Sequence, residues 1–246
     1  MKIAIIIPTL NERGSLPLLF AELQIIIPKI QSQGYELEFV IVDDNSTDNT
    51  QKYVEECAKN NLLPLKLIKR QEKGLATAVL RGFAETNAEI LCVMDADLSH
   101  PPELLVKMAE NIKNYDLVLP CRNMPGGGAE EWPFHRKLTS MIATDLVKFI
   151  NIKARDPLSG FFMLKRSIID GIDLSPIGYK ILLEILVKGK YKNFIEIPYI
   201  FRNRAVGTSK MSGRIIGQYL KHLLVLKQWQ KNLKQIKTLN EKQELL

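Results

Sequence analysis

Two aspartates, Asp95 and Asp97, directly follow an apolar run at residues 90–94 that is typical of a buried β-strand. Side chains at alternate positions of an extended chain point to the same side, so both carboxylates can converge on one object. Two neighbouring anions repel each other, and a shared cation removes that repulsion. Oxygen ligands suit Mg²⁺ or Mn²⁺, and proteins usually hold Mg²⁺ through one or two carboxylates plus substrate phosphates. The pair therefore predicts a metal site, with a simple turn before Pro101-Pro102 as the alternative.

The elements that must position these aspartates alternate along the first half of the chain. Strand patterns occur at residues 2–8, 38–44, 65–69, 90–94 and 116–120, and helix patterns at 15–33, 50–60, 74–84 and 102–114. This alternation predicts an α/β fold with a doubly wound, mostly parallel central sheet flanked by helices. Ligands of such sheets bind beyond the carboxyl ends of the strands, where both Asp43-Asp44 and the Asp95/Asp97 pair stand. We expect Pro28 to break or kink the first helix.

The second half has less regular patterns and ends in a basic amphipathic segment. We expect helices at 132–151 and 176–188, strands near 162 and at 194–199, and a polar loop at 202–213. From residue 215 onwards apolar residues recur at helical spacing among many lysines, a pattern that suits packing on the domain, a partner subunit or a membrane surface. The sequence thus predicts a catalytic domain at 1–212 and a C-terminal amphipathic helical extension at 213–246 without a transmembrane segment.

Charge and composition narrow the function classes. The net charge is +7, and it is uneven, because residues 1–150 carry 16 basic and 20 acidic side chains while residues 151–246 carry 18 and 7. A basic half attracts anions such as phosphorylated substrates or an acidic membrane surface.

Nucleic acid is not expected as a partner, because no known nucleic-acid module is present and aromatic residues are not interleaved with the basic ones. The glycine-rich phosphate loops of dinucleotide-binding dehydrogenases and P-loop NTPases are also missing. Three cysteines without metal spacing, and no signal-peptide pattern, predict a cytosolic setting.

Six motifs, taken in order, resemble those of a known enzyme family. They are Ile-Ile-Pro-Thr-Leu-Asn-Glu at 6–12, Val-Asp-Asp-Asn-Ser-Thr-Asp at 42–48, Lys-Gly-Leu-Ala-Thr-Ala at 73–78, Met-Asp-Ala-Asp-Leu-Ser-His-Pro-Pro-Glu at 94–103, Asp-Pro-Leu-Ser-Gly-Phe-Phe at 156–162 and Arg-Ala-Val-Gly-Thr-Ser-Lys at 204–210. Together they resemble the family 2, GT-A-fold glycosyltransferases, and within them the dolichyl-phosphate (polyprenyl-phosphate) mannosyltransferases. The similarity covers residues 3–212.

The resemblance implies a metal-dependent, inverting transfer of mannose from GDP-mannose to dolichyl or polyprenyl phosphate, with Mg²⁺ or Mn²⁺ bound by Asp95 and Asp97. The implied nucleotide-sugar-binding residues are Pro8, Asn11, Glu12, Asp43, Asp44, Lys73, Gly74, Asp95, Ala96 and Asp97. The implied acceptor-binding residues are Arg122, Arg136, Ser159, Gly160, Arg204 and Lys210. Catalysis is expected to depend on Asp97, Arg122, Arg136, Arg204 and Lys210.

One departure and several alternatives stay open at this point. Many members of the family have Gln where this chain has Ser99, and that Gln often helps to bind the cation. The same chemistry with UDP-glucose or another nucleotide sugar, a soluble acceptor, and a non-catalytic sugar-nucleotide-binding subunit are the alternatives. Without a transmembrane segment, we expect peripheral attachment at the cytoplasmic face of a membrane, through the amphipathic helix or a small membrane subunit.

Overall fold

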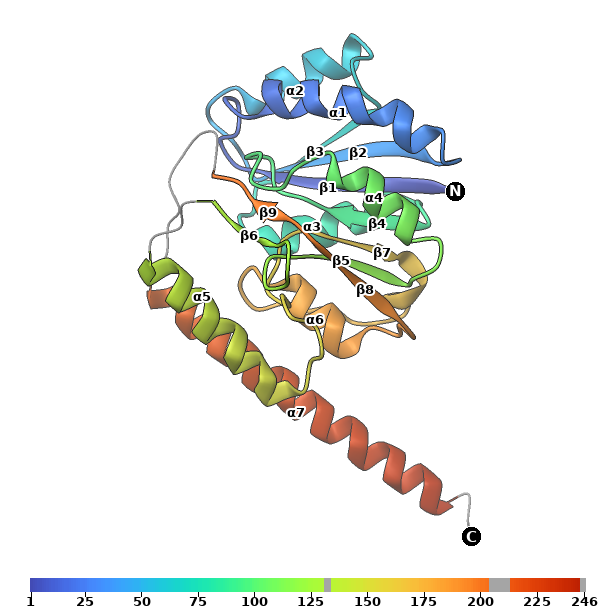
Figure 1. Cartoon of the computed structure of the whole chain (residues 1–246), viewed down its shortest axis with the longest axis vertical. Coiled ribbons are helices and arrows are strands. Elements are labelled where there is room, and N and C mark those ends of the chain that lie inside the picture. Colours follow the sequence, from blue (N-terminus) through green and yellow to red (C-terminus); the bar gives the residue numbers. More distant parts are fainter. Residues whose placement is uncertain (131–133, 204–212, 244–246) are drawn as a thin grey trace.

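A seven-stranded sheet forms the centre of the molecule in the computed structural model (Figure 1). The structure describes residues 1–130, 134–203 and 213–243. The strand order is β3-β2-β1-β4-β7-β5-β8, and β6 and β9 form a second, two-stranded sheet. The strands are β1 Lys2–Thr9, β2 Glu36–Asp43, β3 Leu65–Lys69, β4 Ile90–Val93, β5 Leu117–Cys121, β6 Gly128–Ala129, β7 Phe162–Lys165, β8 Phe194–Pro198 and β9 Ile200–Phe201. The helices are α1 Leu16–Gln31, α2 Thr50–Lys59, α3 Leu75–Ala84, α4 Leu104–Asn111, α5 Phe134–Val147, α6 Ile181–Lys188 and α7 Gly213–Gln243, with short 3₁₀ turns η1 Lys148–Ile150 and η2 Arg166–Ile168.

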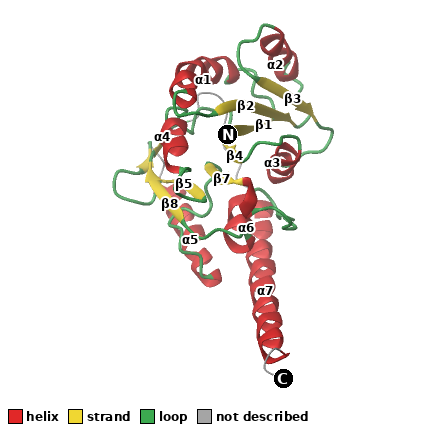
Figure 2. Cartoon of the chain, turned by 90° about the vertical axis from the view of Figure 1, so that its right-hand side faces the viewer, coloured by secondary structure: helices red, strands yellow, loops and turns green. Residues whose placement is uncertain are grey.

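Helices cover both faces of this sheet, as the alternating pattern predicts (Figure 2). Successive residues of β1 point to opposite faces, so Ile3, Ile5 and Ile7 pack under α1, α2 and α4. Ala4 and Ile6 enter the other core, which α3 and α6 cover. Because β1 is buried on both sides, it has the continuous apolar sequence of an internal parallel strand.

Strand β7 lies between β4 and β5 and interrupts the parallel order of the sheet. The strand at 117–121 does not pair with β4, because β7 lies between them and runs antiparallel to both. Cys92 of β4 pairs with Met163 of β7, and Val118 of β5 pairs with the same Met163. The sheet is therefore mostly parallel with one antiparallel insertion. The insertion carries the segment that precedes β7 to the carboxyl end of β4.

Helix α1 continues through Pro28, so the expected break at this residue is wrong. Proline removes one backbone N–H and crowds the preceding turn, but the helix has less than one turn left to form. The Ser32 amide still donates to the Pro28 carbonyl at 2.9 Å. Ile26 and Ile30, on either side of the proline, are buried in the core and hold this last turn in place.

Helix α7 packs lengthwise against α5 and η1 (Figure 1). Tyr219, Leu223 and Leu226 of α7 form an apolar cluster with Val147 and Ile150. The Tyr219 hydroxyl also donates to the Ala143 carbonyl at 2.5 Å. The packing alternative is thus confirmed for one stripe of α7. Among the described helices, none combines the length and the hydropathy that a bilayer-crossing segment requires.

Candidate active site

The two aspartates of the predicted metal site lie in a turn directly after β4. Asp97 is only 4% exposed, and its Oδ1 accepts a hydrogen bond from the Ser99 amide at 3.0 Å. This bond requires a tight turn, and Leu98 adopts a positive φ of 64° to make it. A left-handed backbone at a leucine costs on the order of 1–3 kcal/mol and is typically found where function constrains the chain. The turn therefore holds the Asp97 carboxylate at a fixed place at the end of β4.

His100 fixes the position of Asp95. Its Nδ1 accepts a hydrogen bond from the Asp95 amide at 2.9 Å, and its Nε2 lies 3.8 Å from Asp95 Oδ2. The ring is buried and stacks on Phe161 with centroids 4.8 Å apart. Burial lowers the pKa of His100 below its usual value, against the opposing effect of the nearby Asp95 and Asp97 charges. The neutral ring thus accepts a hydrogen bond from the Asp95 backbone and holds this part of the turn in place.

The segment before β7 brings Arg122 and Gly160 to the same place. Arg122 donates from Nε to Asp156 Oδ2 at 2.7 Å and from Nη2 to Asp156 Oδ1 at 2.8 Å. This bidentate pair is largely buried, and Asp156 keeps the guanidinium charged. Gly160 lies against Asp95, since a methyl group in place of its hydrogen would come 3.6 Å from Asp95 Oδ1. Residues far apart in the sequence thus meet at the carboxyl end of β4.

The sequence interpretation missed Lys180, which stands at the start of α6 and supports this segment. Its Nζ donates to the Leu158 carbonyl at 2.6 Å and lies 4.4 Å from the centre of the Tyr179 ring. Burial, followed by the positive charge of Arg122, lowers the pKa of Lys180 to about 8. No motif or residue spacing around Lys180 indicates a functional role. Only its contact with the 156–160 turn in the structure identifies it. Asp156 belongs to the Asp-Pro-Leu-Ser-Gly-Phe-Phe motif, but only the structure shows it as the partner of Arg122.

The acidic end of β2 organises the neighbouring loop. The fully buried Asp43 carboxylate accepts hydrogen bonds from Thr9 Oγ1 at 2.8 Å, Ser46 N at 2.9 Å, Ser46 Oγ at 2.6 Å and Gln51 Nε2 at 2.7 Å. These four bonds join the ends of β1 and β2 to α2. Through these contacts Asp43 fixes the strand ends at which nucleotide binding is predicted.

Asp44 connects the same strand end to α3. Its Oδ2 accepts from the Gly74 amide at 2.7 Å, and its Oδ1 lies 3.4 Å from Arg70 Nε. Burial raises the pKa of Asp44, and the Gly74 hydrogen bond and Arg70 oppose that rise. Gly74 has a φ of 154°, and a Cβ there would come 2.9 Å from Thr77 Oγ1, so the position requires glycine. The predicted Lys73 is exposed beside it.

The predicted Asn11-Glu12 turn after β1 is built into the β2–α2 loop. Asn11 has a φ of 60°, and its Oδ1 accepts from the Thr47 amide at 2.9 Å. The Glu12 amide donates to Thr50 Oγ1 at 3.0 Å. Pro8, near the end of β1, is partly exposed next to this turn. The structure thus brings the predicted nucleotide residues Pro8, Asn11, Glu12, Asp43, Asp44, Lys73 and Gly74 to adjacent strand ends.

The remaining predicted residues divide into two groups. Ala96 is buried between the two aspartates, and Ser159 is buried with its Oγ accepting from the Phe161 amide at 3.1 Å. Arg136 belongs to the first turn of α5, and its side chain is outside the described part of the chain, as are Arg204 and Lys210 entirely. The structure therefore assembles the metal and nucleotide side of the predicted site and does not describe three of its predicted cationic groups.

The residues present fit a divalent cation held jointly with a substrate. Within the described ranges, no group of three or more His, Cys, Asp and Glu side chains is arranged to enclose a metal ion. Two carboxylates, one of them partly exposed, match the site that Mg²⁺ uses when phosphates complete its coordination. The buried Ser99 Oγ has no hydrogen-bond partner among the described residues, so a hydroxyl stands at the position of the family's Gln.

Comparisons with known proteins agree with this geometry. Residues 4–172 match the family model described as glycosyl transferase family 2. A protein of Pyrococcus furiosus named dolichol-phosphate mannosyltransferase is 44% identical over 241 residues, which cover 96% of this chain and 66% of that protein. One of Saccharomyces cerevisiae with the same name is 36% identical over 76% of this chain and 73% of its own. An undecaprenyl-phosphate mannosyltransferase of Micrococcus luteus is 31% identical over 89% and 90% of the two chains.

Solved structures confirm the fold. A glucosyl-3-phosphoglycerate synthase from Mycobacterium tuberculosis, crystallised with Mn²⁺, UDP and glucosyl-3-phosphoglycerate, superposes with a TM-score of 0.65 over 92% of this chain and 78% of its own, at 16% identity. At that identity the likeness shows the GT-A fold alone. The fold, the acidic turn after β4 and the match over most of the sequence lead to one conclusion: the chain belongs to glycosyl transferase family 2.

Proposed function

We propose that this protein transfers mannose from GDP-mannose to a dolichyl or other polyprenyl phosphate, with inversion at the anomeric carbon and with a divalent cation. The carrying observation is that Asp95 and Asp97 lie next to the Arg122–Asp156 pair around the buried His100 ring. Carboxylates for a cation and a fixed guanidinium for a phosphate are the two groups that such a transfer needs. The names of the relatives supply the choice of sugar and acceptor.

The charges explain how the site would act on two anionic substrates. Asp95 and Asp97 would hold the cation, which supplies Lewis-acid stabilisation of the negative charge that develops on the leaving diphosphate. A phosphomonoester has a second pKa of about 6, so the acceptor phosphate is largely dianionic at neutral pH and has no proton to lose before it attacks. The reaction therefore needs no protein base to activate the acceptor. It needs positive side chains that bring the phosphate close to the sugar, and Arg122 supplies one of them.

Asp156 and Lys180 would act on the position of Arg122. The bidentate Asp156 contact fixes the guanidinium plane, and the Lys180 contact with the Leu158 carbonyl fixes the turn that carries Asp156. A guanidinium that is already oriented loses less freedom when a phosphate binds. We propose the contacts of Arg136, Arg204 and Lys210 with phosphate on the resemblance alone.

We further propose that α5 and α7 contact a membrane surface, where a polyprenyl phosphate resides. Large apolar side chains of both helices are exposed, and they are Leu138, Met141, Ile142 and Leu146 of α5 and Ile216, Leu220, Leu224, Val225 and Leu233 of α7. Exposed lysines accompany them on α7, such as Lys221 and Lys231. Soluble domains rarely expose so many large apolar residues on neighbouring helices without a partner. Apolar residues mixed with lysines suit the interface of an anionic bilayer.

The test is the reaction itself. Purified protein with Mn²⁺, radiolabelled GDP-mannose and polyprenyl phosphate in detergent should yield organic-phase label, and EDTA should abolish that yield. Calorimetric titration with GDP and with UDP in the presence of Mn²⁺ should show tighter binding of GDP. Clearly tighter binding of UDP than of GDP would contradict GDP-mannose as the donor. Label that stays in the aqueous phase would contradict a polyprenyl phosphate as the acceptor.

A further inference from the structure

The hydrogen bonds of His100 fix which ring nitrogen carries the proton. Its Nδ1 lies 2.9 Å from the backbone nitrogen of Asp95, and a backbone amide can only donate a hydrogen bond. Nδ1 is therefore the acceptor and carries no proton. A neutral imidazole has one N–H group, so the proton lies on Nε2. The contact that supports the turn thus also makes Nε2 a donor.

This donor faces the carboxylate of the same aspartate. Nε2 lies 3.8 Å from Asp95 Oδ2, which is longer than an N–H···O hydrogen bond of about 2.7–3.2 Å. The Asp95 side chain is 31% exposed, whereas that of His100 is 2% exposed. The carboxylate is therefore the partner with room to move, and a small rotation of it would close the distance.

Aromatic side chains from distant parts of the chain hold the His100 ring in place. Phe161 stacks on it with ring centroids 4.8 Å apart, and Tyr199 and Phe201 meet it edge-on at 6.3 and 5.7 Å. The Gly160 backbone also approaches the ring, because a Cβ at this glycine would lie 3.5 Å from His100 Cε1. A ring that is packed on several sides cannot turn to follow a moving carboxylate. Its Nε2–H group therefore keeps one direction.

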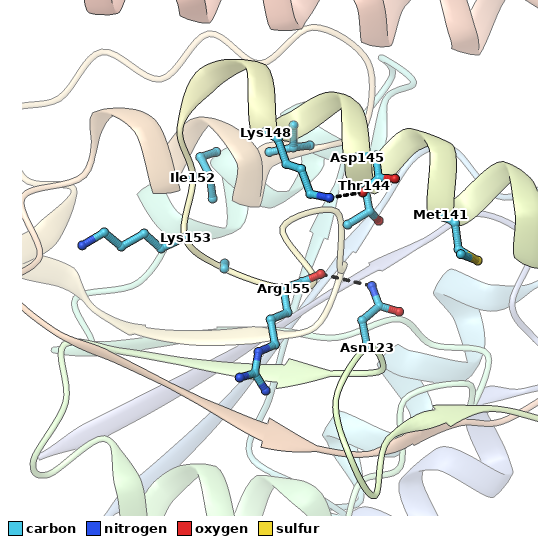
Figure 3. Close-up of a pocket in the computed structure, with 10 residues that line it drawn as sticks. Asn123, Met141, Thr144, Asp145, Lys148, Ile152, Lys153 and Arg155 are labelled. Carbon is cyan, nitrogen blue, oxygen red and sulfur yellow. Dashed lines mark hydrogen bonds and ion pairs between the residues drawn. The ribbon is translucent and has the colours of Figure 1, made fainter.

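The arginine of the site has separate support. Asp156 binds Arg122 through two side-chain hydrogen bonds. Asn123 Nδ2 donates to the Arg155 carbonyl at 3.1 Å, beside the open pocket drawn in Figure 3. These contacts join the two segments of the arginine pair without using the imidazole. Loss of the imidazole N–H should therefore act on the cation side of the site and leave the arginine in place.

We propose that His100 is a positioning residue for the cation, and that its Nε2–H donates to Asp95 Oδ2 when this carboxylate turns to bind the metal. The inference rests on the proposed function, since it takes Asp95 as a ligand of a divalent cation. A hydrogen bond to one carboxylate oxygen fixes the group and leaves the other oxygen for the cation. Removal of such a partner behind a metal ligand typically lowers metal affinity by about 10- to 100-fold.

Two substitutions separate the roles of the two ring nitrogens. In His100→Asn the side-chain oxygen can take the place of Nδ1 and accept from the Asp95 amide, but no group reaches the place of Nε2. In His100→Gln the side-chain nitrogen can reach the place of Nε2 and donate to the Asp95 carboxylate, but the acceptor at Nδ1 is lost. Both variants lose the ring and its stacking on Phe161, so they are matched for the lost packing.

The measured quantity is the gain in nucleotide affinity that Mn²⁺ provides. Calorimetric titrations of the full chain with GDP and with UDP, each in Mn²⁺ and in EDTA, give this ratio for the nucleotide that binds more tightly. His100→Asn should lower the ratio about tenfold or more, and His100→Gln should keep it within about threefold of the wild type. Both variants should keep the wild-type affinity in EDTA.

Thermal unfolding of the same two variants supplies the second measurement. His100→Gln should have the lower midpoint, because it loses the acceptor for the Asp95 amide that His100→Asn keeps. Affinity and stability should therefore change in opposite order. A ring that served only as packing would lower the Mn²⁺ ratio equally in both variants.

An unchanged ratio in His100→Asn, or an equal fall in both variants, overturns the role of His100. A wild-type affinity that Mn²⁺ does not raise for either nucleotide overturns the cation of the proposed function, and the role of His100 with it. The predicted split between the two variants with UDP as the tighter nucleotide supports the role of His100 and contradicts GDP-mannose as the donor.

Discussion

At the scale of single residues, the candidate site depends on a strained turn. Leu98 takes a left-handed conformation so that the Ser99 amide can reach Asp97 Oδ1. His100, immediately after this turn, accepts from the Asp95 amide. Each of the two aspartates is therefore fixed by a neighbour within five residues. A carboxylate that is fixed before substrate arrives needs little reorganisation when a cation binds.

Asp97→Asn should reduce turnover by about 10²- to 10³-fold, the usual effect of removing one group that stabilises transition-state charge. The amide oxygen can still accept from Ser99, so the turn remains, while the negative charge that attracts the cation is lost. Steady-state assays over a range of Mn²⁺ concentrations measure this effect. Asp170→Asn, at an exposed aspartate beyond β7, is the control and should keep full activity. Normal turnover of Asp97→Asn would remove the metal assignment.

Lys180 predicts a pH dependence. Its pKa is lowered to about 8, so its ammonium is present below that pH and is lost as the pH rises through it. The neutral amine holds the Leu158 carbonyl less strongly, and kcat/KM should therefore fall above about pH 8. Lys180→Arg, which stays charged, should move this alkaline limb to higher pH, and Lys180→Met should be impaired at every pH. Identical pH profiles of wild type and Lys180→Arg would exclude this role.

At the scale of elements, α6 links the site to the C-terminal helix. Lys180 precedes its first turn and holds the 156–160 turn, while Glu184, four residues later, faces α7. Glu184 Oε2 lies 3.5 Å from His222 Nε2, and Glu184 Oε1 lies 2.5 Å from Lys188 Nζ. Leu158 itself packs into the cluster that α5 and α7 share. The 156–160 turn of the candidate site and helix α7 therefore both contact α6.

Glu184→Ala should lower the free energy of unfolding by about 3–5 kcal/mol, because it leaves the largely buried Lys188 ammonium, 2.5 Å from Glu184 Oε1, without its acidic partner. Burial disfavours the charged form of Glu184, but the neighbouring His222 and Lys188 side chains and the hydrogen bond from the Ser175 amide outweigh it and lower its pKa. The stabilisation is thus present at neutral pH and is lost as the pH falls through the lowered pKa. Urea denaturation at pH 7 and at pH 4 measures both effects. Glu110→Ala, at an exposed helical glutamate, should change stability by less than about 0.5 kcal/mol.

At the scale of the whole molecule, α5 and α7 extend along one side of the sheet domain (Figure 1). One stripe of α7 is buried on the domain and holds Tyr219, Leu223 and Leu226. Another stripe, Ile216, Leu220 and Leu224, is exposed. The apolar residues of α7 thus form two adjacent stripes: the buried stripe packs on the domain, and the exposed stripe is the one that we propose to contact a membrane.

The double substitution Leu220→Glu and Leu224→Glu should weaken binding to anionic vesicles at least tenfold. Each change removes apolar area from the proposed contact and adds a charge that an anionic surface repels. Sedimentation with phosphatidylserine-containing vesicles measures binding, and activity on a short acceptor in detergent should be unaffected. The control is Lys107→Glu, at an exposed position on α4, which should bind the vesicles as the wild type does. Undiminished vesicle binding of the double variant would contradict the assignment of this face.

Local sequence alone predicted the five strands and four helices of the first half of the chain and the placement of both acidic pairs at strand ends. The spacing of apolar residues is a local property, and parallel strands bring their carboxyl ends to one edge. The expected nucleotide residues accordingly meet at the ends of β1, β2 and β4. The motifs in sequence order also identified the family, because their order and spacing are properties of the chain and do not depend on its packing.

Tertiary structure decided which distant residues complete the site. Only the antiparallel insertion of β7 between β4 and β5 brings Gly160 against Asp95 and Asp156 onto Arg122. Only packing against the 156–160 turn distinguishes Lys180 from other lysines. Packing likewise decided that α1 continues through Pro28 and which stripe of α7 is buried. These outcomes depend on contacts between residues far apart in the chain. The free energy of such contacts cannot be predicted from the pattern of neighbouring residues.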